Sequence, residues 1–272
     1  MPLITISDCL GCGGREIAER VAGGLNTTLY DDRKLQNKAL AMGVRSEDVK
    51  HIDEKAPGFF DRILSNKHDV YLNFMEAVVY EVAREGEGVI IGHGSQMLLR
   101  DFGCALHVRI HASPDTRVAR IMRGRAISRE AAVKLIRKTD DEKSGFFRFA
   151  FHKDWNDPSL YDLVINTEKV SEESAARLVI ESARSGEISA CSLTALEAME
   201  RLSLEKKIHA ALLWKNINLN LLHIEVLENG ITHISGFSYN EEEKSRIIDT
   251  VKEVPGVVEV RSEMAVSPPS AD

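Results

Sequence analysis

The chain has 272 residues, of which 43% are hydrophobic and 28% are charged, a composition typical of a folded protein of more than one domain. Its formal net charge of −7 argues against general nucleic-acid binding, which needs a basic surface that neutralises phosphates. The N-terminus lacks the basic flank and apolar core of a signal peptide, and no apolar run is long enough to span a bilayer. We therefore expect a cytoplasmic protein without a transmembrane segment.

Strands and helices alternate over the first 185 residues. Short apolar or β-branched runs predict strands at 3–7, 27–30, 89–91, 105–110 and 161–166,. Helical spacing predicts helices at 15–25, 70–84, 114–151 and 170–185, with a further polar helical region after residue 33,. This alternation is typical of an α/β fold with a parallel sheet, helices on both faces, and ligands at the carboxyl ends of the strands.

The pattern changes after residues 185–187. Helices are predicted at 193–214 and 241–254, and strands at 221–227, 231–237 and 257–264,. Asn229-Gly230 between the first two strands indicates a hairpin turn. The sequence therefore predicts two domains, an α/β domain over 1–187 and a small α+β domain of order αββαβ over 194–266, with a disordered tail at 267–272.

A glycine-rich loop follows the first strand. Gly11, Gly13 and Gly14 allow backbone N–H groups to turn towards a phosphate at the N-terminus of the next helix. The loop does not match the pattern G-x-x-x-x-G-K-[ST], because Asp8 takes the place of the first glycine and Gly14 that of the lysine. The alternative is a tight turn that binds no ligand.

Basic residues are concentrated in the segment from Arg117 to Arg148. This segment holds ten Lys or Arg and four acidic residues, a local charge of +6 in an acidic chain. Phosphoryl transfer requires fixed cations around the moving group, so the segment is expected to be a mobile arginine-bearing lid. A solvated helix face whose cations pair with nearby acids is the alternative.

The four cysteines, Cys9, Cys12, Cys104 and Cys191, are too few for a disulfide scaffold, and we expect reduced thiols. Cys9 and Cys12 form a Cys-x-x-Cys motif, for which a redox pair or a metal site is the less favoured interpretation. Small residues that fill a tight loop are the favoured one.

Residues 3–185 resemble the cytidylate-kinase-like family of nucleoside-monophosphate kinases. The resemblance rests on TISxxxGxGGREIAER, LYDDR, VIIGHGSQMLLRD, LHVRIHASPDTRVARIMR and DWNDPSLYDLVINT, of which the last is the most specific. It implies a P-loop kinase core that transfers the γ-phosphate of ATP, with Mg²⁺, to a small acceptor, most readily a nucleoside monophosphate such as CMP.

The resemblance also assigns the site residues. The donor phosphates would lie on Gly11, Cys12, Gly13, Gly14, Arg15 and Glu16, with Arg117 and Arg120 near the base or the lid hinge. The lid cations would be Arg123, Arg125 and Arg137. The acceptor side would include Asp31, Arg33, His93 and Gly94, with Asp31 lining the acceptor or helping to hold Mg²⁺. No residue is assigned as a dedicated metal ligand or general base.

Two departures from the family leave an alternative function open. Asp8 and His93 stand where the family usually has arginine, and an acid beside a phosphate loop opposes anion binding. The alternative is therefore a nucleotide-binding regulator with weak or absent turnover.

Residues 194–266 resemble a BON domain through Gly230, Gly236 and the run at 254–258. That resemblance implies a module that binds a small ligand, a lipid or a protein.

Overall fold

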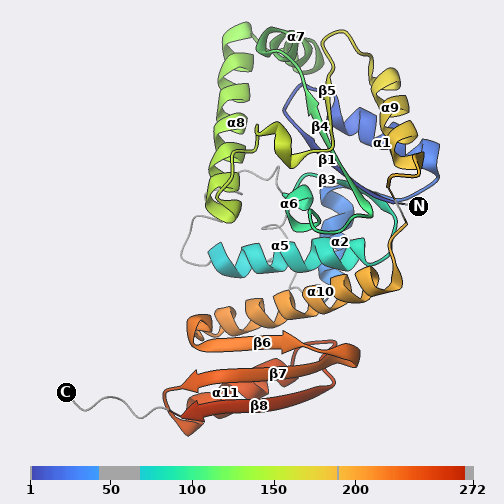
Figure 1. The fold of residues 1–272 in the computed structure, drawn as a ribbon. Coiled ribbons are helices and arrows are strands. Elements are labelled where there is room, and N and C mark those ends of the chain that lie inside the picture. The colour runs from blue at the N-terminus through green and yellow to red at the C-terminus, as the bar shows by residue number, and fades with distance from the viewer. Residues whose placement is uncertain (1, 43–67, 189, 267–272) are drawn as a thin grey trace. The chain divides into compact units, whose positions relative to one another are not determined.

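The computed structural model describes residues 2–42, 68–188 and 190–266 (Figure 1). The chain forms two compact units. The first comprises Met1–Leu35 and Glu85–Ala195, and the second comprises Gln36–Arg84 and Leu196–Asp272. The domain boundaries expected from sequence, 1–187 and 194–266, stay a prediction, and the expected disordered tail lies outside the described residues.

The first unit is built on a parallel sheet, as the alternation of elements predicted. In the described residues the sheet has five strands in the order β2-β3-β1-β4-β5. Their bounds are β1 (Leu3–Asp8), β2 (Leu29–Tyr30), β3 (Gly88–Ile91), β4 (Ala105–His111) and β5 (Leu163–Asn166). The central strand β1 buries Leu3, Ile4 and Ile6 completely, because strands covered on both faces need continuous apolar runs.

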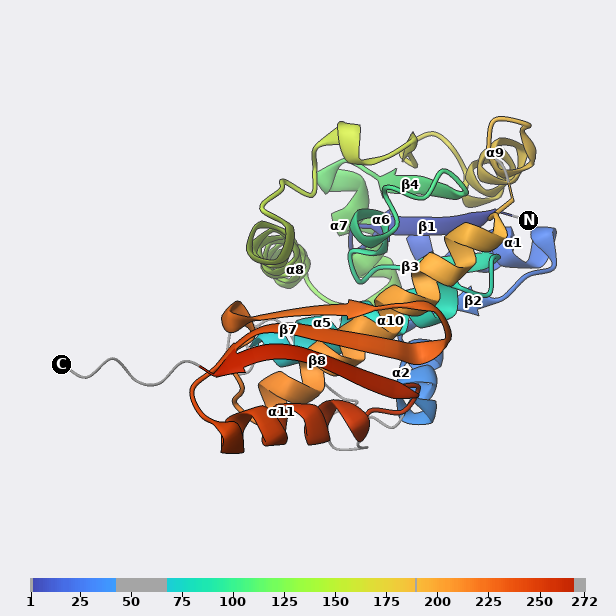
Figure 2. The same ribbon diagram turned by 60° about the horizontal axis from the view of Figure 1, so that its bottom comes forward.

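Helices of the first unit follow the strands in turn. They are α1 (Gly14–Leu25), α6 (Ser95–Leu98), α7 (Pro114–Arg125), α8 (Arg129–Phe151) and α9 (Glu172–Arg184), with a short 3-10 helix η1 (Pro158–Leu160) before β5. Helix α2 (Asp32–Ala41) runs from the first unit into the second. Helices α1 and α9 lie side by side (Figures 1 and 2). This order leaves the turns after β1, β3 and β4 at the carboxyl edge of the sheet.

The basic segment is two helices, so the single helix predicted over 114–151 is wrong. Helix α7 ends because Ala126 adopts a left-handed conformation with φ 51°. Helix α8 then starts afresh, since the Ser128 side chain accepts a hydrogen bond from the Ala131 N–H and caps the new helix,. The cations of this segment are therefore divided between two helices with different orientations (Figure 1).

The expectation of four reduced thiols is also wrong for this structure. Within the first unit, Cys9 is bonded to Cys12 and Cys104 to Cys191. The first pair forms because a tight turn brings the two residues together, with the Cys12 N–H donating to the Cys9 carbonyl at 3.0 Å. The second pair joins positions 87 residues apart in sequence, which no spacing rule reveals.

The C-terminal elements have the predicted αββαβ order. They are α10 (Leu193–Trp214), β6 (Leu222–Val226), β7 (Ile231–Ser238), α11 (Glu241–Lys252) and β8 (Glu259–Val266), with 3-10 helices η2 (Leu219–Leu221) and η3 (Glu228–Gly230) beside β6. Strands β6 and β7 pair antiparallel and β7 and β8 parallel. Asn229 and Gly230 have φ values of 57° and 74°, the left-handed conformations that the Asn-Gly hairpin signal predicts.

Helix α5 (His68–Ala83) belongs to the second unit with α10. The Ser203 hydroxyl of α10 contacts the Ala77 carbonyl at 3.0 Å and the Glu81 carboxylate at 3.1 Å. Lys206 pairs with the buried Glu76 at 2.7 Å. Polar and ionic contacts therefore join these two helices. Among the helices in the described ranges, none is both long and apolar enough to cross a membrane.

Candidate functional site

The turn between β1 and α1 presents backbone N–H groups on one side. Helix α1 begins at Gly14, and its first turn closes with the Ile17 N–H on the Gly13 carbonyl at 3.1 Å. The N–H groups of residues 14–16 therefore have no acceptor within the helix. Together with the helix dipole, such groups favour an anion at this end.

Arginines of α7 hold the carbonyls of the same turn. Arg117 Nε donates to the Leu10 carbonyl at 2.8 Å, and Arg120 Nη1 lies 3.3 Å from the carbonyls of both Gly11 and Cys12. In a trans peptide the N–H points away from the preceding carbonyl. The N–H groups of Gly11 and Gly13 are therefore turned away from the arginines. The Cys12 N–H, in contrast, is engaged by Cys9.

Two glycines of the turn are required by their surroundings. Gly13 has φ 82°, a left-handed conformation that costs other L-residues about 1–2 kcal/mol. Gly14 has no such φ, but a Cβ added to it would collide with the side chain of Asp8. The close approach of Asp8 therefore explains why glycine stands where a P-loop has lysine.

Arg120 also binds the end of β5. Its guanidinium donates to the Thr167 carbonyl at 2.6 Å and to the Thr167 hydroxyl at 2.9 Å. The same hydroxyl donates to the Cys12 carbonyl at 2.8 Å. Arg120 and Thr167 thus anchor the glycine turn to the strand that carries the family-specific motif.

Arg117 links the turn to α8. Besides its bond to Leu10, it makes two bonds of 2.7 Å to the Asp140 carboxylate, and its side chain is only 7% exposed. Bidentate hydrogen bonds between an arginine and a carboxylate are stronger than hydrogen bonds between neutral groups. In the sequence, Asp140 is one of the four acidic residues of the basic segment. In the structure it binds Arg117, which holds the glycine turn.

Lys143 is the partner of Asp8. Its Nζ donates to the Asp8 carbonyl at 2.9 Å and lies 3.7 Å from the carboxylate. Arg15, predicted to bind the donor phosphates, instead binds Glu19 at 3.0 Å and Asp31 at 3.1 Å. The hydrogen bond with Glu19 is the main cause that raises the pKa of Arg15. Asp8 is therefore a partly neutralised acid at the entry to the loop.

The predicted acceptor residues lie after β2 and β3. Asp31 accepts bonds from Arg15 and from the Lys34 N–H at 3.1 Å, while Arg33 is exposed. His93 is buried, and its Nε2 lies 2.9 Å from Asp32 Oδ1. Sequence reasoning missed Asp32, although it directly follows the predicted Asp31.

The backbone after β3 is left-handed at three successive positions. Gly92, His93 and Gly94 have φ values of 79°, 59° and 65°. This conformation is uncommon for a histidine. Such backbone geometry occurs at sites where the surrounding structure fixes it, and here the bond to Asp32 holds the ring of His93.

The predicted lid cations are exposed. Arg123 donates to the Ala119 carbonyl of its own helix at 3.4 Å. In the part of the chain that the structure describes, Arg125 and Arg137 are exposed without an ion pair. The structure therefore does not gather these three side chains at the loop, and their catalytic assignment stays a prediction.

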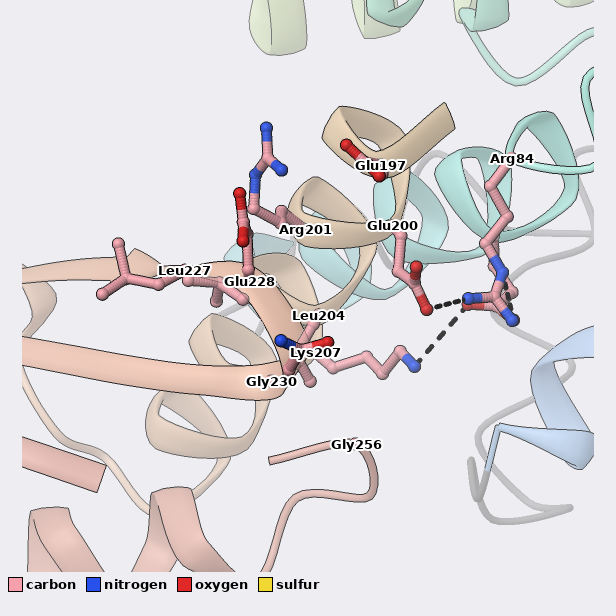
Figure 3. Close-up of a pocket in the computed structure, with 13 residues that line it drawn as sticks. Arg84, Glu197, Glu200, Arg201, Leu204, Lys207, Leu227, Glu228, Gly230 and Gly256 are labelled. Atoms are coloured by element: carbon pink, nitrogen blue, oxygen red, sulfur yellow. Dashed lines mark hydrogen bonds and ion pairs between the residues drawn. The ribbon is translucent and has the colours of Figure 1, made fainter. Parts of the chain in front are cut away.

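A separate pocket lies within the second unit (Figure 3). It has a volume of about 460 Å³ and is lined by the end of α5, by α10 and by the β6–β7 turn. Arg84 pairs there with Glu200 and with Glu81, and Lys207 lies 3.7 Å from Glu81. These four charged side chains of the pocket therefore compensate one another. It contains none of the residues predicted for the phosphate site.

The described fold defines a P-loop kinase-type α/β unit together with a small α+β unit. Residues 3–169 match the model of the cytidylate kinase-like family, and residues 202–268 match that of the BON domain. The chain belongs to the cytidylate kinase-like family and carries a BON domain. Both resemblances inferred from sequence are confirmed.

Two known proteins are similar to the first part of this chain. It is 26% identical over 182 residues to a cytidylate kinase of Pyrobaculum islandicum, a match that covers 66% of this chain and 92% of the relative. A crystal structure of an uncharacterized protein from Eubacterium ventriosum is similar with a TM-score of 0.50 and 20% identity, covering 68% of this chain and 99% of that one. The latter likeness concerns the fold alone.

Proposed function

We propose that this protein is a kinase that transfers the γ-phosphate of ATP to a small acceptor, a nucleoside monophosphate such as CMP. One observation carries the proposal. The carbonyls of the glycine turn are held by Arg117 and Arg120, so that the N–H groups of Gly11 and Gly13 are turned to the opposite side. Such a concavity of N–H groups at a helix N-terminus suits the phosphates of a nucleotide.

In this proposal the chain's own residues position the reactants. The N–H groups of residues 11 and 13–16 bind the donor phosphates, and Arg123, Arg125 and Arg137 add positive charge from the lid as phosphoryl transfer proceeds in line. Asp31, Arg33, His93 and Gly94 form the acceptor side. No general base is required, since positioning and charge stabilisation carry most of the rate in this chemistry.

Two carboxylates near the glycine turn fit a magnesium ion. Mg²⁺ in nucleotide sites is held by one or two carboxylates together with phosphates and water. Asp8 ends β1 and Asp31 follows β2, and both side chains are partly exposed. When bound, the ion neutralises charge on the phosphates. Within the described ranges, no group of three or more His, Cys, Asp or Glu could hold a metal by itself.

A regulator that binds nucleotide without turnover is the second candidate. It is favoured by the carboxylate of Asp8 at the loop entry and by the engagement of His93 with Asp32. In either case we propose that the BON domain is the ligand-binding or interaction module of the chain.

The test is a coupled assay of ADP release with CMP, dCMP, UMP, AMP and non-nucleotide acceptors, run beside calorimetric titration with ATP. A matched pair of variants controls it. Gly14→Ala places a Cβ against Asp8, whereas Gly23→Ala adds a Cβ to the same helix where nothing lies within 4 Å. We expect turnover in the wild type and Gly23→Ala and its loss in Gly14→Ala. ATP binding without turnover on any acceptor would establish the regulator.

A further inference from the structure

Arg109 is a buried cation that the sequence did not single out. It lies on β4, directly opposite Ser7 of β1 in the sheet register, and is 4% exposed. Its guanidinium donates to the Ser7 hydroxyl at 3.0 Å and to the Asn156 side-chain oxygen at 3.2 Å. Arg109 therefore joins the end of β1 to the turn that precedes β5.

An aromatic ring takes the place of an acidic partner. The Arg109 guanidinium carbon lies 3.7 Å from the centroid of the Trp155 ring and 5.8 Å from that of Tyr161. Among the described residues, no carboxylate forms an ion pair with Arg109. Desolvation by burial lowers the pKa of Arg109 although the charges of Tyr161, Asp8 and Asp140 act in the opposite direction, and burying a cation without a direct ion pair is costly. A residue needed for packing alone would fill this place better as an apolar side chain.

The same indole contacts a second cation. Lys143 Nζ, from α8, lies 5.7 Å from the Trp155 ring centroid and donates to the Asp8 carbonyl. Trp155 itself is 3% exposed, and its carbonyl accepts a bond of 2.7 Å from the Tyr161 hydroxyl. Trp155 is thus held by cations from β4 and α8, and the second cation also holds the entry to the glycine turn.

The turn that contains Trp155 also carries exposed polar groups. Asn156 and Asp154 are exposed, and the Asn156 N–H donates to the Asp154 carboxylate at 3.0 Å. Asp157 caps η1 by accepting from the Ser159 N–H at 2.9 Å. These groups form a defined turn at residues 154–157, whose buried anchor is Trp155.

We propose that Arg109 is a positioning residue, which through Trp155 and Asn156 fixes the turn at 154–157 beside Ser7 and Asp8, so that this turn binds the acceptor nucleotide next to the donor phosphates on the glycine loop. This inference rests on the proposed kinase function. Arg109 is buried, and its guanidinium donates to Asn156 of the turn. It therefore acts on the acceptor through the turn and not by direct contact.

The test uses Trp155 as a reporter of the turn. The chain has two tryptophans, so Trp214→Phe leaves Trp155 as the sole emitter. In this background we compare Arg109→Met and Arg109→Lys with His107→Met. His107 is the matched control, because it lies two residues earlier on the same strand and pairs with Thr5 at 2.8 Å as Arg109 pairs with Ser7.

We expect Arg109→Met to shift Trp155 emission to longer wavelength and to increase its quenching by acrylamide. The KM for CMP should rise about tenfold or more, because small displacements at a binding site are costly, while the KM for ATP changes less than about threefold. Arg109→Lys should rescue part of both effects, since it restores charge but not the planar donor group. His107→Met should lose stability yet keep the emission and both KM values.

Unchanged Trp155 emission in folded Arg109→Met would overturn the positioning role. A shifted emission with an unchanged KM for CMP would overturn its link to the acceptor, and so would an equal rise in both KM values. If the wild type neither binds nor converts any nucleotide, the proposed function fails, while the emission shift still decides whether Arg109 fixes the turn. Circular dichroism of each variant separates these results from a failure to fold.

Discussion

Arg117→Met tests the contact that orients the glycine turn. The substitution keeps an unbranched side chain in a buried position but removes the donors that bind the Leu10 carbonyl and the Asp140 carboxylate. Asp140 is then left without its guanidinium partner. The Leu10 carbonyl is left without the bond that fixes its peptide unit.

The expected loss of unfolding free energy follows from these contacts. Breaking a buried ion pair by removing one partner costs about 3–5 kcal/mol, but Asp140 is 31% exposed, and water will solvate part of the unpaired carboxylate. The lost bond to Leu10 adds about 1.5–3 kcal/mol as a charged donor, although the two losses are not additive. We therefore expect a total of about 3 kcal/mol, together with a fall in ADP affinity of about tenfold or more because the turn loses its orientation.

Urea unfolding and calorimetric titration with ADP measure the two effects. Arg129→Met is the control, since Arg129 also makes a 2.7 Å ion pair with an aspartate, Asp115, but both side chains are exposed, at 60% and 85%. That pair should contribute less than about 1 kcal/mol, and its loss should leave ADP binding unchanged. If Arg117→Met behaves like Arg129→Met in both measurements, the assignment of Arg117 as the anchor of the turn is refuted.

Three further predictions concern single positions. Gly13→Ala should lower the free energy of unfolding of the unliganded protein by about 1–2 kcal/mol, because Gly13 has a φ of 82°,. It should also abolish ADP binding. An unchanged stability in thermal unfolding would contradict this prediction. Without Mg²⁺, Asp8→Asn should tighten ADP binding about fivefold, or by about 1 kcal/mol, because it removes an acid that Lys143 only partly neutralises. Weaker binding in magnesium-free calorimetry would instead show that Asp8 itself binds the nucleotide. Burial lowers the pKa of His209 from 6.5 to about 4, so the unfolded chain takes up the proton first, and the free energy of unfolding should fall by about 2–3 kcal/mol as the pH drops from 6.5 to 4. His209→Gln should remove that part of the pH dependence in urea titrations, and an unchanged slope would show that other groups cause it.

The order of elements could be predicted from sequence because each strand and helix carries its own period. The parallel sheet, the αββαβ unit and the Asn229-Gly230 hairpin follow from such local signals. The break between α7 and α8 was missed because helical spacing continues on both sides of it. Its local marker is Ser128, a common N-cap residue, whose capping bond the structure reveals.

The site could be predicted less completely, because spacing reports which charges are present and not what they touch. Arg117 and Arg120 were predicted to lie near the base or the lid hinge, yet they hold the glycine turn. Asp8 was predicted to oppose anion binding at the loop, and the sequence did not show that Lys143, 135 residues away, lies against it. Arg109 was not predicted as a functional residue, because an arginine within an apolar strand belongs to no sequence motif that indicates a function. Contacts between distant parts of the chain decide all these roles.

Transfer of labelled γ-phosphate from ATP to CMP, with the product resolved by chromatography, tests the central claim most directly. The account predicts labelled CDP with the wild type and with Gly23→Ala, and none with Gly14→Ala, in which the new Cβ meets Asp8. Labelled product from Gly14→Ala at the wild-type rate would contradict the role of the glycine turn. Absence of labelled product from the wild type with CMP and every other acceptor, while ATP still binds, would contradict the kinase function itself.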